Sequence, residues 1–128
     1  MYSCSTLYGP SRSHHRFVAS DLATLLAYQY HNTAHFPAFY GALTVPREAP
    51  FGFMRQGSDA WLDRVAFKTG TMNEPVSVCG IAGYLRKRDG GWIAFAVIVN
   101  GGPGASHIPH ETAMRAVRSD LEDILAHE

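Results

Sequence analysis

The fold is decided by residues 78 to 100, which read VCGIAGYLRKRDGGWIAFAVIVN. Residues 78–87 and 92–100 are both apolar and β-branched enough to form strands, and the first is interrupted by two glycines. Between them, the RDGG sequence at 88–91 is a strong turn signal, because Asp-Gly accepts the positive φ angles that two-residue turns require. We therefore predict an antiparallel hairpin.

The last segment of the chain is predicted to form a helix that covers one face of this hairpin. Residues 110–127 have helical periodicity, with one apolar face formed by Met114, Val117, Leu121, Ile124 and Leu125. Ser106 or His107 is the expected cap of this helix, with Pro109 in its first turn. The second strand of the hairpin is apolar throughout, which indicates that both faces are covered, and one helix covers only one face.

The first half of the chain is mainly helical in its sequence signals. A helix is predicted over 20–31, with Ser20 as its N-cap and leucines at helical spacing. A second, short helix is expected within 36–46, a loop over 47–57 and a single helical turn within 58–64. The 20–31 helix is the candidate for the second layer. Without that layer, an exposed apolar face would favour self-association or require a missing part of the protein.

These elements predict an α+β fold with three antiparallel strands and a helix at each end. The first strand is expected over 65–68, ahead of the hairpin. At 128 residues the chain has the size of one domain or of part of a larger one. We expect a single incomplete domain, with an irregular and helical segment over 1–60 and the strands and last helix over 64–128.

Composition and charge exclude several classes of function. Hydrophobic residues make up 46% and charged residues 17% of the chain, which is typical of a folded protein. Lys plus Arg is 11 and Asp plus Glu is 11, so the basic excess needed to bind nucleic acid or an anionic membrane is absent. No apolar run is long enough to span a membrane, and the first 17 residues do not resemble a signal peptide.

We interpret the cysteines, histidines, acidic residues and aromatics as parts of the core or the surface, and not as functional sites. Cys79 is expected to pack as a small buried residue in a strand, although a disulfide with Cys4 stays open. No metal site is predicted from His31 and His35, because their HNTAH segment contains neither a Glu nor a Cys. A solvated helix face is expected for the acidic residues Asp120, Glu122 and Asp123, and core packing for the aromatics Phe36, Phe39, Tyr40, Phe51 and Phe53. No cofactor is expected.

One short motif carries chemistry: Lys68, Thr69 and Gly70 form a Lys-Thr-Gly sequence at the end of the first predicted strand. The chain has only two lysines, so Lys68 is not part of a generally lysine-rich surface. An ammonium beside a cleft stabilises negative charge during nucleophilic attack and attracts a substrate carboxylate. A threonine hydroxyl donates a hydrogen bond to such a carboxylate, and glycine lets a peptide backbone lie close to the strand edge.

The surrounding sequence resembles the end of the D-alanyl-D-alanine carboxypeptidase/endopeptidase family, peptidase family S13 of the low-molecular-mass penicillin-binding proteins. The resemblance rests on KTGT at 68–71, IAGY at 81–84, the Asp-Gly turn at 89–90 and FAVIVN at 95–100. It covers roughly residues 8 to 125 and is strongest from 64 to 101. One departure is the MNEP sequence after Thr71, which makes the next connection longer than is usual in the family.

The resemblance implies a transpeptidase-like fold and a periplasmic serine enzyme of the cell wall. Such an enzyme cleaves the terminal D-Ala from peptidoglycan stem peptides through an acyl-enzyme, and β-lactams acylate the same serine. Lys68 would supply positive charge, Thr69 would hold the carboxylate, Gly70 would admit the substrate and Thr71 would supply an oxyanion-hole N–H.

Two family motifs are absent from the chain. No serine is followed three residues later by a lysine, and the SxN motif is missing. Tyr30-His31-Asn32 matches a YxN variant but follows the SRSHHRF segment at 11–17, whereas the family's second motif precedes the segment that SRSHHRF resembles. We therefore interpret it as a helix end. We therefore expect the C-terminal portion of such an enzyme, inactive alone and able to pair with a missing portion. The alternative is a non-catalytic binding or assembly module, or a truncated remnant.

Overall fold

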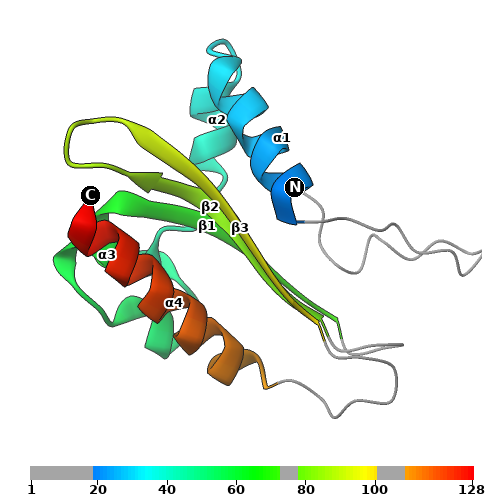
Figure 1. The fold of residues 1–128 in the computed structure, drawn as a ribbon, viewed down its shortest axis with the longest axis vertical. Coiled ribbons are helices and arrows are strands. Elements are labelled where there is room, and N and C mark those ends of the chain that lie inside the picture. Colours follow the sequence, from blue (N-terminus) through cyan, green and yellow to red (C-terminus); the bar gives the residue numbers. More distant parts are fainter. Residues whose placement is uncertain (1–18, 73–77, 101–108) are drawn as a thin grey trace, which may run out of the picture.

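The computed structural model describes residues 19–72, 78–100 and 109–128 (Figure 1). In chain order the elements are α1 (Ala19–His31), α2 (Phe36–Gly41), the short 3₁₀ helices η2 (Pro46–Glu48) and η3 (Gly52–Arg55), α3 (Asp59–Arg64), β1 (Val65–Met72), β2 (Val78–Arg86), β3 (Trp92–Asn100) and α4 (His110–His127). The three strands form one antiparallel sheet in the order β1-β2-β3. Helix α4 lies on one face of this sheet, and α1 and α2 lie on the other. The predicted α+β fold is confirmed.

The β2–β3 hairpin is the centre of the sheet and matches its prediction, with one difference in the turn. The Lys87 N–H donates to the Gly91 carbonyl at 2.7 Å, and the Gly90 N–H donates to the Lys87 carbonyl at 3.1 Å. Gly90 has a φ of 89°. The loop therefore has three residues, 88–90, and the predicted two-residue turn was wrong. Gly90, the glycine with positive φ, is the last of three loop residues and not one of two. Asp89 accepts the Gly91 N–H at 2.8 Å, which holds the pKa of its carboxyl below the usual value.

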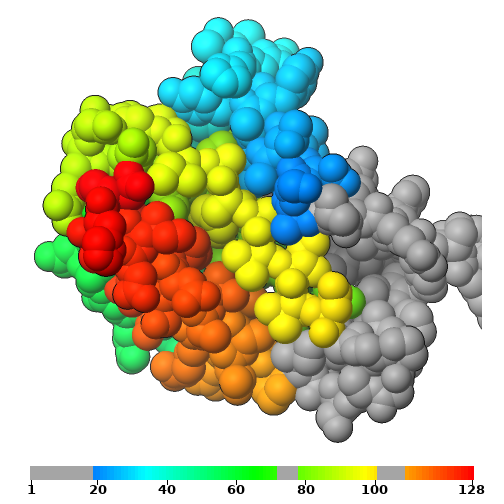
Figure 2. Space-filling view, in the orientation of Figure 1, coloured from blue at the N-terminus to red at the C-terminus, as the bar shows by residue number. Residues whose placement is uncertain are grey.

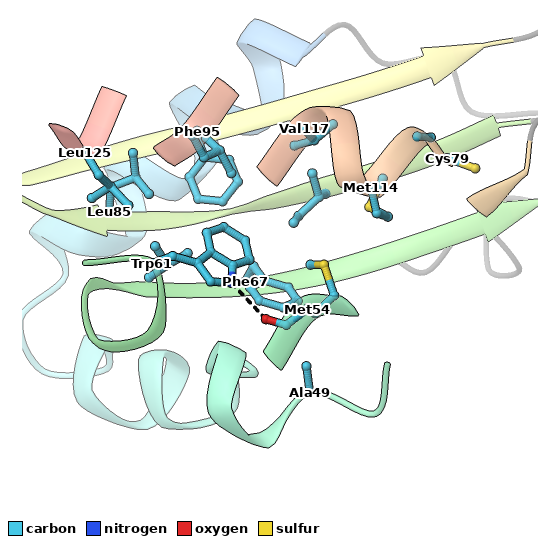
Figure 3. Close-up of a cluster of buried hydrophobic side chains, with 14 residues drawn as sticks. Ala49, Met54, Trp61, Phe67, Cys79, Leu85, Phe95, Met114, Val117 and Leu125 are labelled. Carbon is cyan, nitrogen blue, oxygen red and sulfur yellow. Dashed lines mark hydrogen bonds between the residues drawn. The ribbon is translucent and has the colours of Figure 1, made fainter. Parts of the chain in front are cut away.

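The larger core lies between the sheet and α4 (Figure 3). Trp61 of α3 is completely buried in it, and its indole N–H donates to the Met54 carbonyl at 2.8 Å. The Trp61 ring stacks on Phe67 of β1 with ring centres 6.0 Å apart. Cys79 is buried on the same side, as the sequence predicted, and Cys4 lies outside the described residues. The segment before β1 thus closes the core beneath the sheet.

Helix α4 spans the predicted residues, but its start differs from the prediction. Pro109 occupies the N-cap position, with no side-chain cap, instead of the first turn. Ser106 and His107 lie outside the described residues. At the other end, Arg64 donates to the Leu125 carbonyl at 3.1 Å and Arg88 to the Ala126 carbonyl at 3.3 Å. These cations satisfy carbonyl groups that a helix end leaves without partners.

The second face of the sheet is covered by α1 and α2, so the predicted second layer is confirmed. Its buried centre is Tyr84, whose hydroxyl donates to the Leu26 carbonyl of α1 at 2.7 Å. Burial raises the pKa of Tyr84 to about 12. The helix starts no later than Ala19, so Ser20 lies inside it and is not the predicted N-cap. Figure 2 shows β3, in yellow, between α1 and the orange-to-red α4.

Three further predictions need correction. Strand β1 continues to Met72, four residues past the predicted end at Lys68, because it pairs with β2 along its whole length. The segment predicted as loop contains η2 and η3. Glu122 was assigned to a solvated helix face, yet it accepts the Ser58 N–H at 2.7 Å and so ties α4 to the start of α3. None of the described helices is long and apolar enough to cross a membrane.

Candidate functional site

The Lys-Thr-Gly sequence lies on an edge strand. On one side of β1, Lys68 pairs with Ala82 of β2 and Gly70 pairs with Gly80. On the other side, the only pairing among the described residues is an isolated bridge between Phe67 and Thr44, with both N–H···O distances at 2.9 Å. From Thr69 onward, that side of β1 has no strand partner within the described part of the chain.

The bridge fixes the direction of the backbone groups along this edge. In an antiparallel sheet both polar groups of one residue point to the same side of the strand, and the side alternates along the chain. Because Phe67 bonds to Thr44, the N–H and C=O groups of Thr69 and Thr71 also point away from β2. We call these four groups the open edge. They provide two donors and two acceptors for an added strand.

Lys68 places a positive charge at the open edge. Its side chain is exposed, and its Nζ donates to the Thr69 carbonyl, one of the open-edge acceptors, at 2.7 Å. No carboxylate of the described residues forms an ion pair with it, whereas the second lysine, Lys87, lies near Asp89 and Glu128. The ammonium is therefore available to an anion that arrives along the edge.

The four predicted site residues do not all share one face of the sheet. Lys68 and Gly70 alternate with Thr69 and Thr71, so the first pair belongs to the α1 face and the second pair to the α4 face. On the α1 face the pairing of Gly70 with Gly80 leaves two adjacent positions without side chains. The backbone of β1, and not a cluster of side chains, is what brings the four residues together.

The start of β1 is held firmly, which fixes the position of the motif that follows. Val65, Ala66 and Phe67 are all buried. Gly83 on β2 is required at its position because a Cβ there would overlap the Ala66 carbonyl oxygen and lie 2.7 Å from the Phe67 Cα. The motif thus begins where a rigid anchored segment ends.

Comparison with known proteins identifies the family of the chain. The model of the D-Ala-D-Ala carboxypeptidase 3 (S13) family matches residues 9–125, which is most of the chain. The chain belongs to that family. No curated protein and no solved structure matches it.

Within this S13 chain, the sequence interpretation missed Thr44. A single residue that pairs with a distant strand has no periodicity, so the sequence carries no signal for it. The position of the chain on either side of Thr44 is nonetheless well defined, because Leu43 packs with the α1 layer and Pro46 is buried.

The Tyr30-His31-Asn32 sequence lies elsewhere in this S13 chain. Tyr30 packs against Phe36 and against Trp92 of β3, with ring centres 5.1 and 6.3 Å away. Tyr30, Tyr84 and Trp92 border a hollow of about 220 Å³ next to α1. Strand β2 separates β3 from the Lys-Thr-Gly strand, so this sequence does not join the motif.

The histidines of the described S13 chain do not gather into one site. His31 and His35 are exposed, while His110 packs on Phe51 and Phe53 with ring centres 4.9 and 6.2 Å away. Burial against these rings lowers the pKa of His110. The described residues contain no group of three or more metal-ligating side chains. His14, His15 and His107 lie outside them.

Proposed function

We propose that the open edge of β1 binds a peptide in extended conformation whose C-terminal carboxylate lies beside Lys68. The peptide would be the D-Ala-D-Ala end of a peptidoglycan stem peptide, and a β-lactam would occupy the same place. In this proposal Lys68 supplies charge, Thr69 holds the carboxylate, Gly70 leaves room for the substrate and Thr71 supplies an oxyanion-hole N–H.

The observation that carries the proposal is the Lys68 ammonium at an unpaired strand edge in an S13 chain. An added strand gains main-chain hydrogen bonds from such an edge, and this mode of recognition needs no deep pocket. The membership of the family supplies the chemical class of the peptide.

Cleavage needs an activated nucleophile. The sequence contains no serine with a lysine three residues later, which is the arrangement that activates the hydroxyl in the family. We infer that this chain by itself binds the peptide and does not hydrolyse it. In a complete S13 enzyme, the same edge would hold the substrate for attack by a serine from another segment.

The experiment is an NMR titration of the ¹⁵N-labelled chain with an acylated L-Lys-D-Ala-D-Ala tripeptide. The expected result is a saturable shift of the Thr69 and Thr71 amide signals, because their N–H groups would bond to the peptide. The variant Lys68→Met should weaken binding by about tenfold or more, since it removes a charged hydrogen-bond partner of the carboxylate.

The chain offers a matched control in its second lysine. Lys87 sits at the hairpin, and Lys87→Met removes the same charge without touching the open edge. Equal weakening of peptide binding by both variants would mean that the loss depends only on net charge and not on the position of Lys68. Amide shifts that appear elsewhere and spare β1 would overturn the proposed site.

A further inference from the structure

We propose that Thr44 determines where the bound peptide ends, and thereby restricts this site to the free C-terminus of a peptide. This inference rests on the proposed function, and it adds a specificity-determining residue. It concerns whether the site takes only the ends of peptides or also chains that continue past the residue beside Lys68.

Thr44 blocks one end of the open edge. Its N–H donates to the Phe67 carbonyl and its carbonyl accepts the Phe67 N–H, each at 2.9 Å. These are the groups that a strand bound at Thr69 and Thr71 would use next if it continued past Lys68. Among the described residues nothing pairs with the edge toward Met72, whereas an extension in the opposite direction collides with Thr44.

Thr44 is not a loosely held loop residue that a peptide would displace easily. The preceding Leu43 packs against the α1 layer, and its N–H donates to the Tyr40 carbonyl at 3.0 Å. The following chain enters η2, where Pro46 is fully buried. Displacement of Thr44 would break two backbone hydrogen bonds and disturb packing on both sides of it.

The position of Lys68 sets the direction of the peptide. The residue follows Phe67 directly, so the ammonium lies at the blocked end of the open edge. A carboxylate held there places the peptide C-terminus next to Thr44 and its N-terminus toward Met72. The peptide then runs antiparallel to β1, and its last residue has no room to be followed by another.

Three peptides separate the contribution of Thr44 from that of charge. The first is the acylated L-Lys-D-Ala-D-Ala tripeptide with a free carboxylate. The second is the same tripeptide as a C-terminal amide, and the third carries two further glycines that end in a carboxylate. Binding to the full chain is measured from the Thr69 and Thr71 amide shifts, and hydrogen exchange is followed at the Thr44 amide, which loses its acceptor if a peptide displaces it from Phe67.

We expect the free tripeptide to bind best, the amide to bind less tightly and the extended peptide to bind about tenfold more weakly than the amide. The Thr44 amide should stay protected from exchange with all three peptides. Thr44→Pro removes the N–H that bonds to Phe67, and it should reduce the difference in binding affinity between the amide and the extended peptide. The wild-type exchange measurement keeps the test decisive if this variant does not fold.

The possible failures are distinguishable. If the extended peptide binds as tightly as the amide, with shifts at Thr69 and Thr71, Thr44 sets no limit and the inference is overturned while the proposed function stands. Loss of protection at the Thr44 amide when the extended peptide binds would have the same meaning, because Thr44 would then have been displaced from Phe67. If none of the three peptides shifts these amides, the proposed function itself fails.

Discussion

The tight backbone contact at Gly83 gives a sharp test of the structure. Gly83 lies opposite Phe67, and a Cβ at position 83 would overlap the Ala66 carbonyl oxygen and come within 2.7 Å of the Phe67 Cα. Both obstacles are backbone atoms of a buried strand segment, so no side chain can rotate away to make room. The substitution Gly83→Ala therefore has to push β1 away from β2.

The expected cost is at the upper end of the range for overpacked cores, about 3 kcal/mol. That cost lowers the folding equilibrium constant by more than about a hundredfold, since each 1.4 kcal/mol is a factor of ten. With a urea m-value of about 2 kcal/mol/M, the midpoint should fall by about 1.5 M. Trp61 is completely buried, so the tryptophan fluorescence reports the transition.

Gly80 on the same strand is the matched control. A Cβ at position 80 meets only the Val97 carbonyl oxygen at 3.6 Å, an ordinary contact. Gly80→Ala should therefore stay within about 1 kcal/mol of the parent, since the residue change is otherwise the same. Equal midpoints for the two variants would refute the claim that β1 approaches β2 this closely at Gly83. A selective loss at Gly83 would support the rigid start of β1 on which the site geometry depends.

Three further predictions follow from the described contacts and from the sequence. Tyr84→Phe should lower the free energy of unfolding by about 1 kcal/mol in urea denaturation, because the hydroxyl bond to the Leu26 carbonyl is lost; an unchanged midpoint would contradict that bond. Burial lowers the pKa of His110, so the unfolded state binds more protons than the folded state between the ordinary value of 6.5 and the lower folded value. Stability should fall as pH drops through this window, and thermal melts of His110→Phe should lose that slope; an identical slope would assign it to other groups. A fluorescent penicillin should leave no covalent label on the denatured chain, and a surviving label would reveal a nucleophile that the sequence motifs do not identify.

The hairpin and the last helix were the easiest parts to predict, because short-range patterns specify them. The apolar run of β3 and the Asp-Gly turn gave the pairing, and helical periodicity gave α4 with the bounds His110–His127. The end of β1 was harder, since Thr69, Gly70 and Thr71 have the polar character of a loop. Their strand conformation comes from pairing with β2, which is a long-range property that local composition does not encode.

The candidate site shows the same division between local and long-range information. The sequence supplied the four residues of the motif, since their identities and order carry the resemblance to S13 enzymes. It did not supply the edge position of β1, the direction of the Thr69 and Thr71 backbone groups or the bridge to Thr44. Each of these depends on which strand lies beside β1, and residues far apart in the chain decide that.

An unpaired strand edge is a risk to a protein as well as a binding surface, because another copy of the chain is able to pair with it. Natural sheets reduce this risk by placing lysine on edge strands and by keeping the exposed stretch short. In this chain Lys68 lies on the edge strand, and the bridge to Thr44 shortens the unpaired stretch. Two β1 edges that approach each other bring two ammonium groups together, whereas a peptide with a terminal carboxylate brings the opposite charge. Lys68 and the short unpaired stretch therefore disfavour pairing of the edge with itself, while the charge of Lys68 favours the proposed peptide.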